Sequence, residues 1–347
     1  MSDVNVGAIQ PMAKTILVTD IASYRLASAN DLIKLLPVPC CNALVLPRWL
    51  LDAVVIGIVK GKRIHITGPT GTAKTSLVKA LERVPDNFDC ICRALNLPQK
   101  SLLVKHIESC VFETPGEVIQ RRAVKNGTSY DEYSLLVNAL RAAETEKEQN
   151  YVVIFLKEMG RVHSAAVQGG FLNLMERDVV ELPDGTAVNV SGLTWLADSN
   201  YGAEHDATHA LVLFDDALKR RFNDHISMEY LTPEQEMDVI TTLIADDLNF
   251  HNVQHEWIDE VVRLGQQIRQ LRTEGSLTNV VPPTIDGYLS YLSKRLEQPY
   301  LDIQQVANIV FFGPASSDER KQLPSIVNQL FGIATDDDMD FADVSFI

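Results

Sequence analysis

The sequence predicts an α/β core built on a mainly parallel sheet, followed by a smaller all-α domain. A glycine-rich loop at residues 68–76 lies between an apolar run, 63–67, and a helix-forming run, 76–83. The continuous apolar run 151–156 (YVVIFL) indicates a strand buried on both faces, as in a parallel sheet. Strands and helices alternate until about Leu231, and helical patterns alone follow. This alternation is typical of a parallel sheet covered by helices.

Composition indicates a globular chain with room for two domains. The 347 residues are 46% hydrophobic and 22% charged. No apolar run approaches the roughly 20 residues that span a bilayer, and the N-terminus lacks a basic region followed by an apolar stretch. Five cysteines, an odd number, favour reduced thiols and a cytoplasmic location. The pairs Cys40/Cys41 and Cys90/Cys92 have no second half with zinc spacing, so we expect buried thiols there.

The segment before the loop is expected to be a leader that packs on the core. In this leader, residues 1–47, the stretch 15–18 favours a short strand, and 28–36 favours a helix that Pro37 ends. A helix over 48–59 then leads to the loop strand. The remaining elements predicted in the core are a strand at 90–95, helices at 101–109, 130–148 and 165–177, a hairpin within 179–190 around Pro183-Asp184-Gly185, and a strand at 193–197.

A change of pattern near Leu231 predicts a domain boundary. Thr232 and Pro233 start a helix with a threonine cap and proline in the first turn. The helices expected in this part are 233–247, 255–272, 284–296, 301–312 and 319–331. The expected division is therefore a leader at 1–47, an α/β nucleotide-binding domain at 48–230, a helical lid at 231–333 and an acidic, disordered tail at 334–347, which could also dock on a partner.

The glycine-rich loop, GPTGTAKTS, predicts a phosphate site. A loop between a strand and a helix can wrap a polyphosphate with backbone N–H groups, where the helix dipole also favours anions. Lys74 would reach the outer phosphates of ATP, and the Thr75 hydroxyl would hold Mg²⁺. Ala73 stands where the strict pattern has glycine. The residues expected to bind the nucleotide are Gly68, Pro69, Thr70, Gly71, Thr72, Ala73, Lys74, Thr75 and Ser76.

Two residues after the buried strand 151–156 bear on hydrolysis. Glu158 lies where a base that orients the attacking water belongs. Lys157 occupies the position of the aspartate that usually helps to hold the metal. A cation beside Mg²⁺ is repelled, by about 4 kcal/mol at 4 Å for unit charges at an effective dielectric near 20. Lys157 would swing away, contact phosphate directly, or leave a site that binds and cleaves poorly.

Three further polar residues are candidates for the reaction. Asn200, in LADSNY, could hydrogen-bond the γ-phosphate or the water from a strand tip, although asparagine is also common in turns. Arg221, and after it Arg220, could reach a neighbouring subunit's nucleotide, or form a surface pair at a helix end. His205 and His209 have the spacing of metal ligands on a helix, but their segment favours a loop, so we expect no metal there.

Five segments occur in an order that resembles the AAA+ ATPases, and among them the MoxR-like and dynein-related group. They are GPTGTAKT, IFLKEMGRV, GGFLNLMERDVVELPDGTAVNV, LADSNY and LFDDALKRRF. The resemblance implies a homo-oligomeric ring, usually a hexamer, with ATP between subunits and Arg221 at a neighbour's γ-phosphate. It also implies a chaperone that remodels or activates a partner complex, often with a von Willebrand A domain protein. The group places an arginine near the start of a lid helix, where this chain has Ile285 after the cap Thr284.

Three functions remain open at this point. The first is an ATP-hydrolysing remodeller of protein partners. The second is an ATP-binding scaffold with weak hydrolysis, which Lys157 and Ile285 favour. The third is a nucleic-acid-associated loader, which the net charge of −15 disfavours. Its basic lining would have to come from Arg121, Arg122 and Lys125, which we expect on a solvated helix face.

Overall fold

The computed structural model describes residues 14–39, 41–200, 215–245 and 247–332. They form two compact units that divide between Tyr230 and Leu231. In the first unit the strands are β1 (Thr15–Leu17), β2 (Leu32–Lys34), β3 (Val45–Pro47), β4 (Arg63–Gly68), β5 (Ser101–Glu108), β6 (Gln120–Lys125), β7 (Thr128–Tyr133), β8 (Asn150–Lys157), β9 (Val179–Glu181), β10 (Ala187–Asn189), β11 (Thr194–Asn200) and β12 (Asp224–Ser227). Its helices are α1 (Ile21–Leu26), α2 (Arg48–Val59), α3 (Lys74–Arg83), α4 (Pro85–Ala94), α5 (Leu135–Glu146), α6 (Ala165–Met175) and α7 (Asp216–Lys219). The second unit contains α8 (Pro233–Ala245), α9 (His255–Thr273), α10 (Ile285–Glu297), α11 (Ile303–Val310), α12 (Ser317–Arg320) and α13 (Leu323–Phe331).

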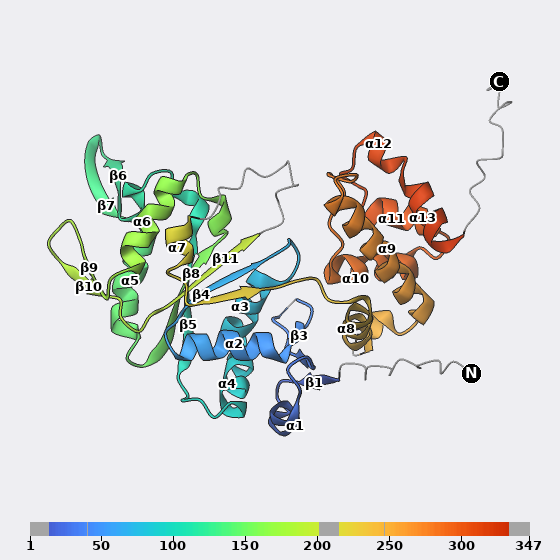
Figure 1. Cartoon of the computed structure of the whole chain (residues 1–347), viewed down its shortest axis with the longest axis horizontal. Helices are drawn as coiled ribbons and strands as arrows, with labels where there is room; N and C mark the ends of the chain where they lie inside the picture. Colours follow the sequence, from blue (N-terminus) through green and yellow to red (C-terminus); the bar gives the residue numbers. More distant parts are fainter. Residues whose placement is uncertain (1–13, 40, 201–214, 246, 333–347) are drawn as a thin grey trace, which may run out of the picture. The chain divides into compact units, whose positions relative to one another are not determined.

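A five-stranded sheet organises the first unit (Figure 1). Its order is β12-β4-β11-β8-β5, and every neighbouring pair is parallel. β4 therefore lies between β11 and β12, although β5 follows it in the chain. In such sheets ligands bind at the carboxyl ends of the strands, where the order reverses. The predicted α/β fold with a parallel sheet is confirmed.

Two hydrophobic cores cover the two faces of this sheet. On one face α2, α3 and α4 pack on side chains that include Val153 and Phe155 of β8. On the other face α5 and α6 pack on the alternate residues Val152 and Ile154. Both faces of β8 are thus buried, which explains why its sequence is a continuous apolar run. The predictions of β8, of the helix α2 and of the β9–β10 hairpin are confirmed.

Three of the predicted elements have a different secondary structure in the protein. The segment predicted as a strand at 90–95 belongs to α4, which starts with Pro85 at its first turn. The segment predicted as a helix at 101–109 is β5. Residues 28–36 contain β2 rather than a helix. In each segment the spacing of the apolar residues fits the period of a helix as well as that of a strand. Contacts with other elements decide which of the two structures forms.

The cysteines of α4 follow the expectation. Cys90 and Cys92 are buried free thiols, and burial raises the pKa of Cys92 to about 12. Cys41 is exposed, contrary to the expectation for the first pair, and Cys40 lies outside the described residues.

The basic cluster lies on a hairpin, not on a helix face. Arg121 and Arg122 belong to β6, which pairs with β7 so that they lie opposite Glu132 and Asp131. The Arg121 guanidinium contacts the Glu132 carboxylate at 2.5 Å. The helix predicted over 130–148 is shorter, since its first residues form β7 and Ser134 caps α5. The arginines of this hairpin therefore face acidic partners rather than forming a basic strip.

The second unit is helical, as predicted. Thr232 and Gln235 exchange hydrogen bonds at the start of α8, and the Thr284 hydroxyl accepts from the Gly287 N–H at the start of α10. These contacts satisfy backbone donors that a helix start leaves unpaired. No helix in the described ranges has both the length and the apolar character to cross a membrane.

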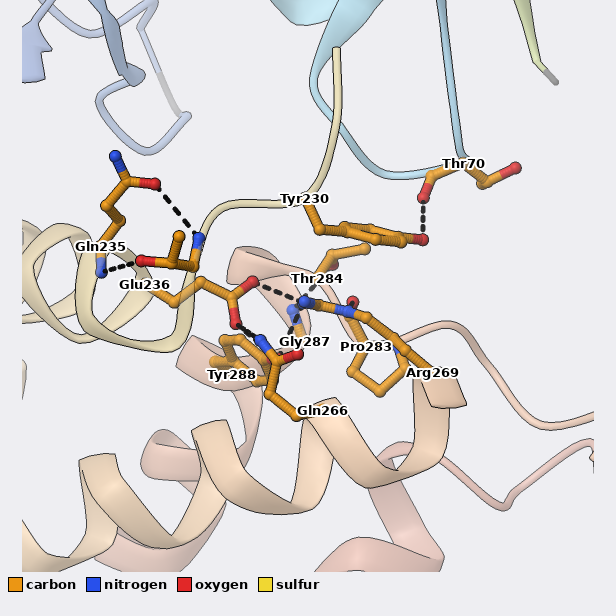
Figure 2. A network of polar contacts seen from close by, with 11 residues as sticks. Thr70, Tyr230, Gln235, Glu236, Gln266, Arg269, Pro283, Thr284, Gly287 and Tyr288 are labelled. Atoms are coloured by element: carbon orange, nitrogen blue, oxygen red, sulfur yellow. Dashed lines mark hydrogen bonds and ion pairs between the residues drawn. The ribbon is translucent and has the colours of Figure 1, made fainter. Parts of the chain in front are cut away.

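A buried polar network joins three helices of the second unit (Figure 2). The Arg269 guanidinium of α9 contacts the Glu236 carboxylate of α8 at 2.6 Å, and their side chains are 8% and 3% exposed. Arg269 also donates to the Pro283 carbonyl and to the hydroxyl of Tyr288 on α10. Burial raises the pKa of Glu236, although Arg269 opposes the shift. Ion pairs this deeply buried depend on such additional hydrogen bonds.

Candidate functional site

The glycine-rich loop connects the end of β4 to the start of α3, at the carboxyl edge of the sheet. Gly68 has φ +153°, and a Cβ on it would lie 2.1 Å from the carbonyl oxygen of Met228. Only glycine fits this close approach. Thr72 donates its hydroxyl to the Pro69 carbonyl at 3.0 Å, which closes the loop. The hydroxyl of Tyr230 donates to the Thr70 carbonyl at 2.8 Å (Figure 2).

Ala73, the departure from the strict loop pattern, adopts a left-handed backbone conformation that glycine accepts more readily than alanine. Its φ of 65° and ψ of 20° lie in the left-handed region. This region costs an L-residue roughly 1 kcal/mol more than it costs glycine. The loop therefore keeps its backbone path at a modest cost in strain.

The Lys74 side chain is folded onto its own loop. Its ammonium donates to the carbonyls of Gly68 and Pro69 at 2.8 and 2.6 Å, and the residue is only 7% exposed. Burial lowers the pKa of Lys74 to about 8, and the negative charge of Asp198 counteracts part of that shift. Incoming phosphates would have to replace these two carbonyl partners.

A buried carboxylate that the sequence predictions missed lies next to the loop. Asp198 on β11 is 3% exposed, and its Oδ2 accepts the Thr75 hydroxyl at 2.7 Å. Its Oδ1 accepts the backbone N–H of Glu158 at 2.6 Å. The signal for it was an acidic residue that directly follows the buried apolar positions Leu196 and Ala197 of the strand. This single side chain joins the strand ends of β8 and β11 to the loop.

Lys157 pairs with a carboxylate other than that of Asp198. Its ammonium contacts Glu108 Oε1 at 2.5 Å, and the two residues are register partners on β8 and β5. Of the three possibilities open from sequence, the structure has Lys157 turned to the neighbouring strand.

The chain turns away from the direction of β8 at Glu158, because the φ of this residue, 52°, lies in the left-handed region. Its carboxylate contacts the Arg161 guanidinium at 3.1 Å, and the side chain is 39% exposed. A non-glycine residue in this region is uncommon and is often found at functional sites. The carboxylate is accessible to solvent, as a base that orients water must be.

The remaining candidates lie as follows. Asn200 is the last residue of β11 and the register partner of Gly68, so it lies beside the loop. Ser76 is exposed on α3. Arg221 follows α7 and pairs with Glu176 at the end of α6, its Nε donating at 2.8 Å. Arg220 is exposed. His205, His209 and the acidic tail lie outside the described residues.

The lid position where the resembled group has an arginine carries Ile285, which packs in the core of the second unit. Arg295, further along α10, lies over the Trp257 ring at 5.0 Å and is 3.9 Å from Glu260. Arg295 thus has contacts within its own unit.

Comparison with known proteins bears on the first unit. Residues 63–222 match the family model of the AAA domain (dynein-related subfamily). The sequence matches no curated protein. Among solved structures, one similar chain is a protein from Cytophaga hutchinsonii ATCC 33406, described as a proposed ATPase. It has 13% identity and a TM-score of 0.36, with 83% of this chain and 89% of that chain covered, a likeness too weak to carry an argument.

The matched stretch runs from the first residue of β4 to beyond α7. It therefore contains the glycine-rich loop, the β8 strand end with Glu158, and Arg221. The sheet order, the loop between β4 and α3 and the family match agree with one another. Residues 63–222 of the α/β unit are therefore similar to a AAA domain of the dynein-related subfamily, in sequence and in the order of the sheet strands around the glycine-rich loop.

Proposed function

We propose that this chain is a MoxR-like AAA+ ATPase that binds ATP with Mg²⁺ between the subunits of a ring. In this proposal the ring is a homo-oligomer, most simply a hexamer, and it remodels or activates a protein partner complex. The observation that carries the proposal is the double contact of Asp198 with Thr75 and with Glu158. It brings the loop hydroxyl and the expected base to one edge of the sheet.

The residues present fit ATP and Mg²⁺. The described ranges contain no group of three or more His, Cys, Asp or Glu that could hold a metal alone. Mg²⁺ at a nucleotide site retains waters and is held by one or two protein groups together with substrate phosphates. Thr75 is the loop hydroxyl for that role, and the bound metal would neutralise charge on the phosphates.

Each proposed residue has a defined task. Lys74 exchanges its carbonyl partners for phosphate oxygens, and the backbone of residues 68–73 surrounds the phosphates. Glu158 orients the attacking water, and Asn200 contacts the γ-phosphate or that water. Arg221 releases Glu176 and reaches the nucleotide of a neighbouring subunit, with Arg220 as the second choice.

A weakly hydrolysing scaffold remains the second candidate, because one contact favours it. The Glu158 carboxylate pairs with Arg161 through its Oε2, and this pair competes with the attacking water for that oxygen until it opens. Partner binding could supply the change that opens it. In that case the purified protein would bind ATP but turn it over slowly.

A mixing experiment tests the shared site. Glu158→Gln should lower steady-state ATP turnover strongly, because it removes the base that orients the attacking water. Arg221→Ala should also lower turnover strongly, since an arginine of this kind contributes about 10³- to 10⁵-fold to the rate. Mixed rings of the two variants should regain turnover, because some sites then combine an intact Glu158 with an intact Arg221. Lys74→Ala, which removes the main side-chain partner of the phosphates, should abolish ATP binding at its own site. Mixed with Glu158→Gln it should restore no turnover, because no site then has both ATP and Glu158, whereas mixed with Arg221→Ala it should restore turnover through its intact Arg221.

The outcomes separate the two candidates. Wild-type protein that binds ATP without turnover would favour the scaffold. Full turnover by Arg221→Ala would remove Arg221 from the site. The partner, for which a von Willebrand A domain protein is our proposal, and a cytoplasmic location follow from the resemblance and the cysteine usage.

A further inference from the structure

We propose that Asp198 on β11 is the metal-side acid of the ATP site, in place of the carboxylate that position 157 on β8 lacks. The inference rests on the proposed function, since it assigns a residue to the Mg²⁺ of the nucleotide. Asp198 would act on the metal through Thr75. It is thus a positioning residue for the metal ligand.

The strand register places Asp198 next to the position that it replaces. β11 and β8 pair in parallel, with Ala197 opposite Leu156. One residue further along, Asp198 and Lys157 are at the same level, and residues at one level of adjacent strands project from the same face. Because β11 lies between β8 and β4, Asp198 is one strand nearer to the glycine-rich loop than position 157. A carboxylate there reaches the loop directly.

The hydrogen bond to Thr75 suits a metal ligand. A threonine hydroxyl has one hydrogen to donate and two lone pairs to offer. The hydrogen is used on Asp198 at 2.7 Å, so the lone pairs of Thr75 Oγ1 are available to a cation. Partners of this kind orient a ligand and tune its metal affinity. The N–H of Glu158 holds the other carboxylate oxygen, which couples the ligand to the expected base.

The position of Lys157 removes the electrostatic conflict. β8 lies between β5 and β11, and Lys157 pairs with Glu108 on the β5 side. Asp198 lies on the opposite side of β8. The side chain that would repel Mg²⁺ is therefore neutralised by a partner, while a buried acid faces Thr75. The site thus has its negative charge on β11, at Asp198, instead of on β8, where Lys157 takes the place of the usual aspartate.

The test compares Asp198→Asn with wild type in ATP binding. Affinity for a fluorescent ATP analogue is measured over a Mg²⁺ titration and also in EDTA. Mg²⁺ should increase the affinity for the ATP analogue in both proteins. We expect the Mg²⁺ concentration that gives half of the full increase in affinity to be about 10- to 100-fold higher in the variant, the usual effect of removing such a partner. Affinity in EDTA should stay within about twofold. Asp318→Asn, at an exposed aspartate of α12, makes the same chemical change away from the loop and should match wild type.

Two results would overturn the inference. An unchanged Mg²⁺ dependence would show that Asp198 does not act on the metal. An equal loss of affinity with Mg²⁺ and in EDTA would show that it only holds the loop. Should Asp198→Asn fail to fold, as judged by thermal melting, Asp198→Ser retains an oxygen acceptor and is measured in the same way. Wild type that binds no ATP under any condition would instead refute the proposed function.

Discussion

The lowered pKa of Lys74 predicts how ATP affinity changes with pH. A fall from an ordinary lysine value of about 10.4 to about 8 means that burial favours the neutral amine by roughly 3 kcal/mol. Phosphate oxygens bind the ammonium form. Below about pH 8 this form is already present in the free protein, and above it binding must take up a proton. The dissociation constant of ATP should therefore be nearly flat to about pH 7.5 and then rise, approaching tenfold per pH unit.

The assay is a titration of Mg²⁺-ATP at constant ionic strength between pH 7 and 9.5, above the range near 6 where phosphate itself titrates. Lys74→Arg is the matched control, because a guanidinium keeps its charge over this range. The variant should bind more weakly at pH 7 but with a flat profile. A steep profile in both proteins would show that another group causes it.

Absence of any rise in wild type up to pH 9.5 would refute the reasoning directly. It would mean that Lys74 keeps its proton in the free protein, so that the contacts with the Gly68 and Pro69 carbonyls outweigh desolvation.

Two further predictions concern stability. Arg269→Ala should lower the free energy of unfolding of the second unit, measured in urea, by about 3–5 kcal/mol, because Glu236 is left buried without its partner. The double variant Glu236→Leu with Arg269→Met removes both charges and should lower it much less. Similar losses in the two proteins would contradict a buried-charge origin. Ala73→Gly should raise the free energy of unfolding by up to about 1 kcal/mol, since glycine relieves the left-handed strain at φ 65°. A decrease in the urea midpoint would show that this strain is not significant.

Much of the fold could be predicted from local sequence. The strand β8 is recognisable because both its faces are buried, and the glycine-rich loop because phosphate chemistry restricts its residues. The helices of the second unit are recognisable from caps such as Thr232 and Thr284 and from regular apolar spacing. In these segments the local pattern and the final contacts agree.

Elsewhere the local pattern was ambiguous. β5 is an edge strand whose polar residues find partners, Lys105 with Glu146 and His106 with Glu82, so its pattern also fits a helix. The first residues of the segment predicted as one long helix were taken by β7 instead. Pairing with another strand, which no short window of sequence reveals, decided both cases.

The chain's sequence by itself determined that a phosphate-binding loop, a buried parallel sheet and a helical second unit are present, because each depends on residues close together in the chain. Only the tertiary structure decided which charges lie at the loop. Lys157 stands at the end of β8, yet its charge is directed to Glu108 on β5, while Asp198 on β11 receives the hydroxyl of Thr75. The reason is physical: a carboxylate acts on whatever lies within hydrogen-bond reach, and the order of strands in the sheet sets that distance.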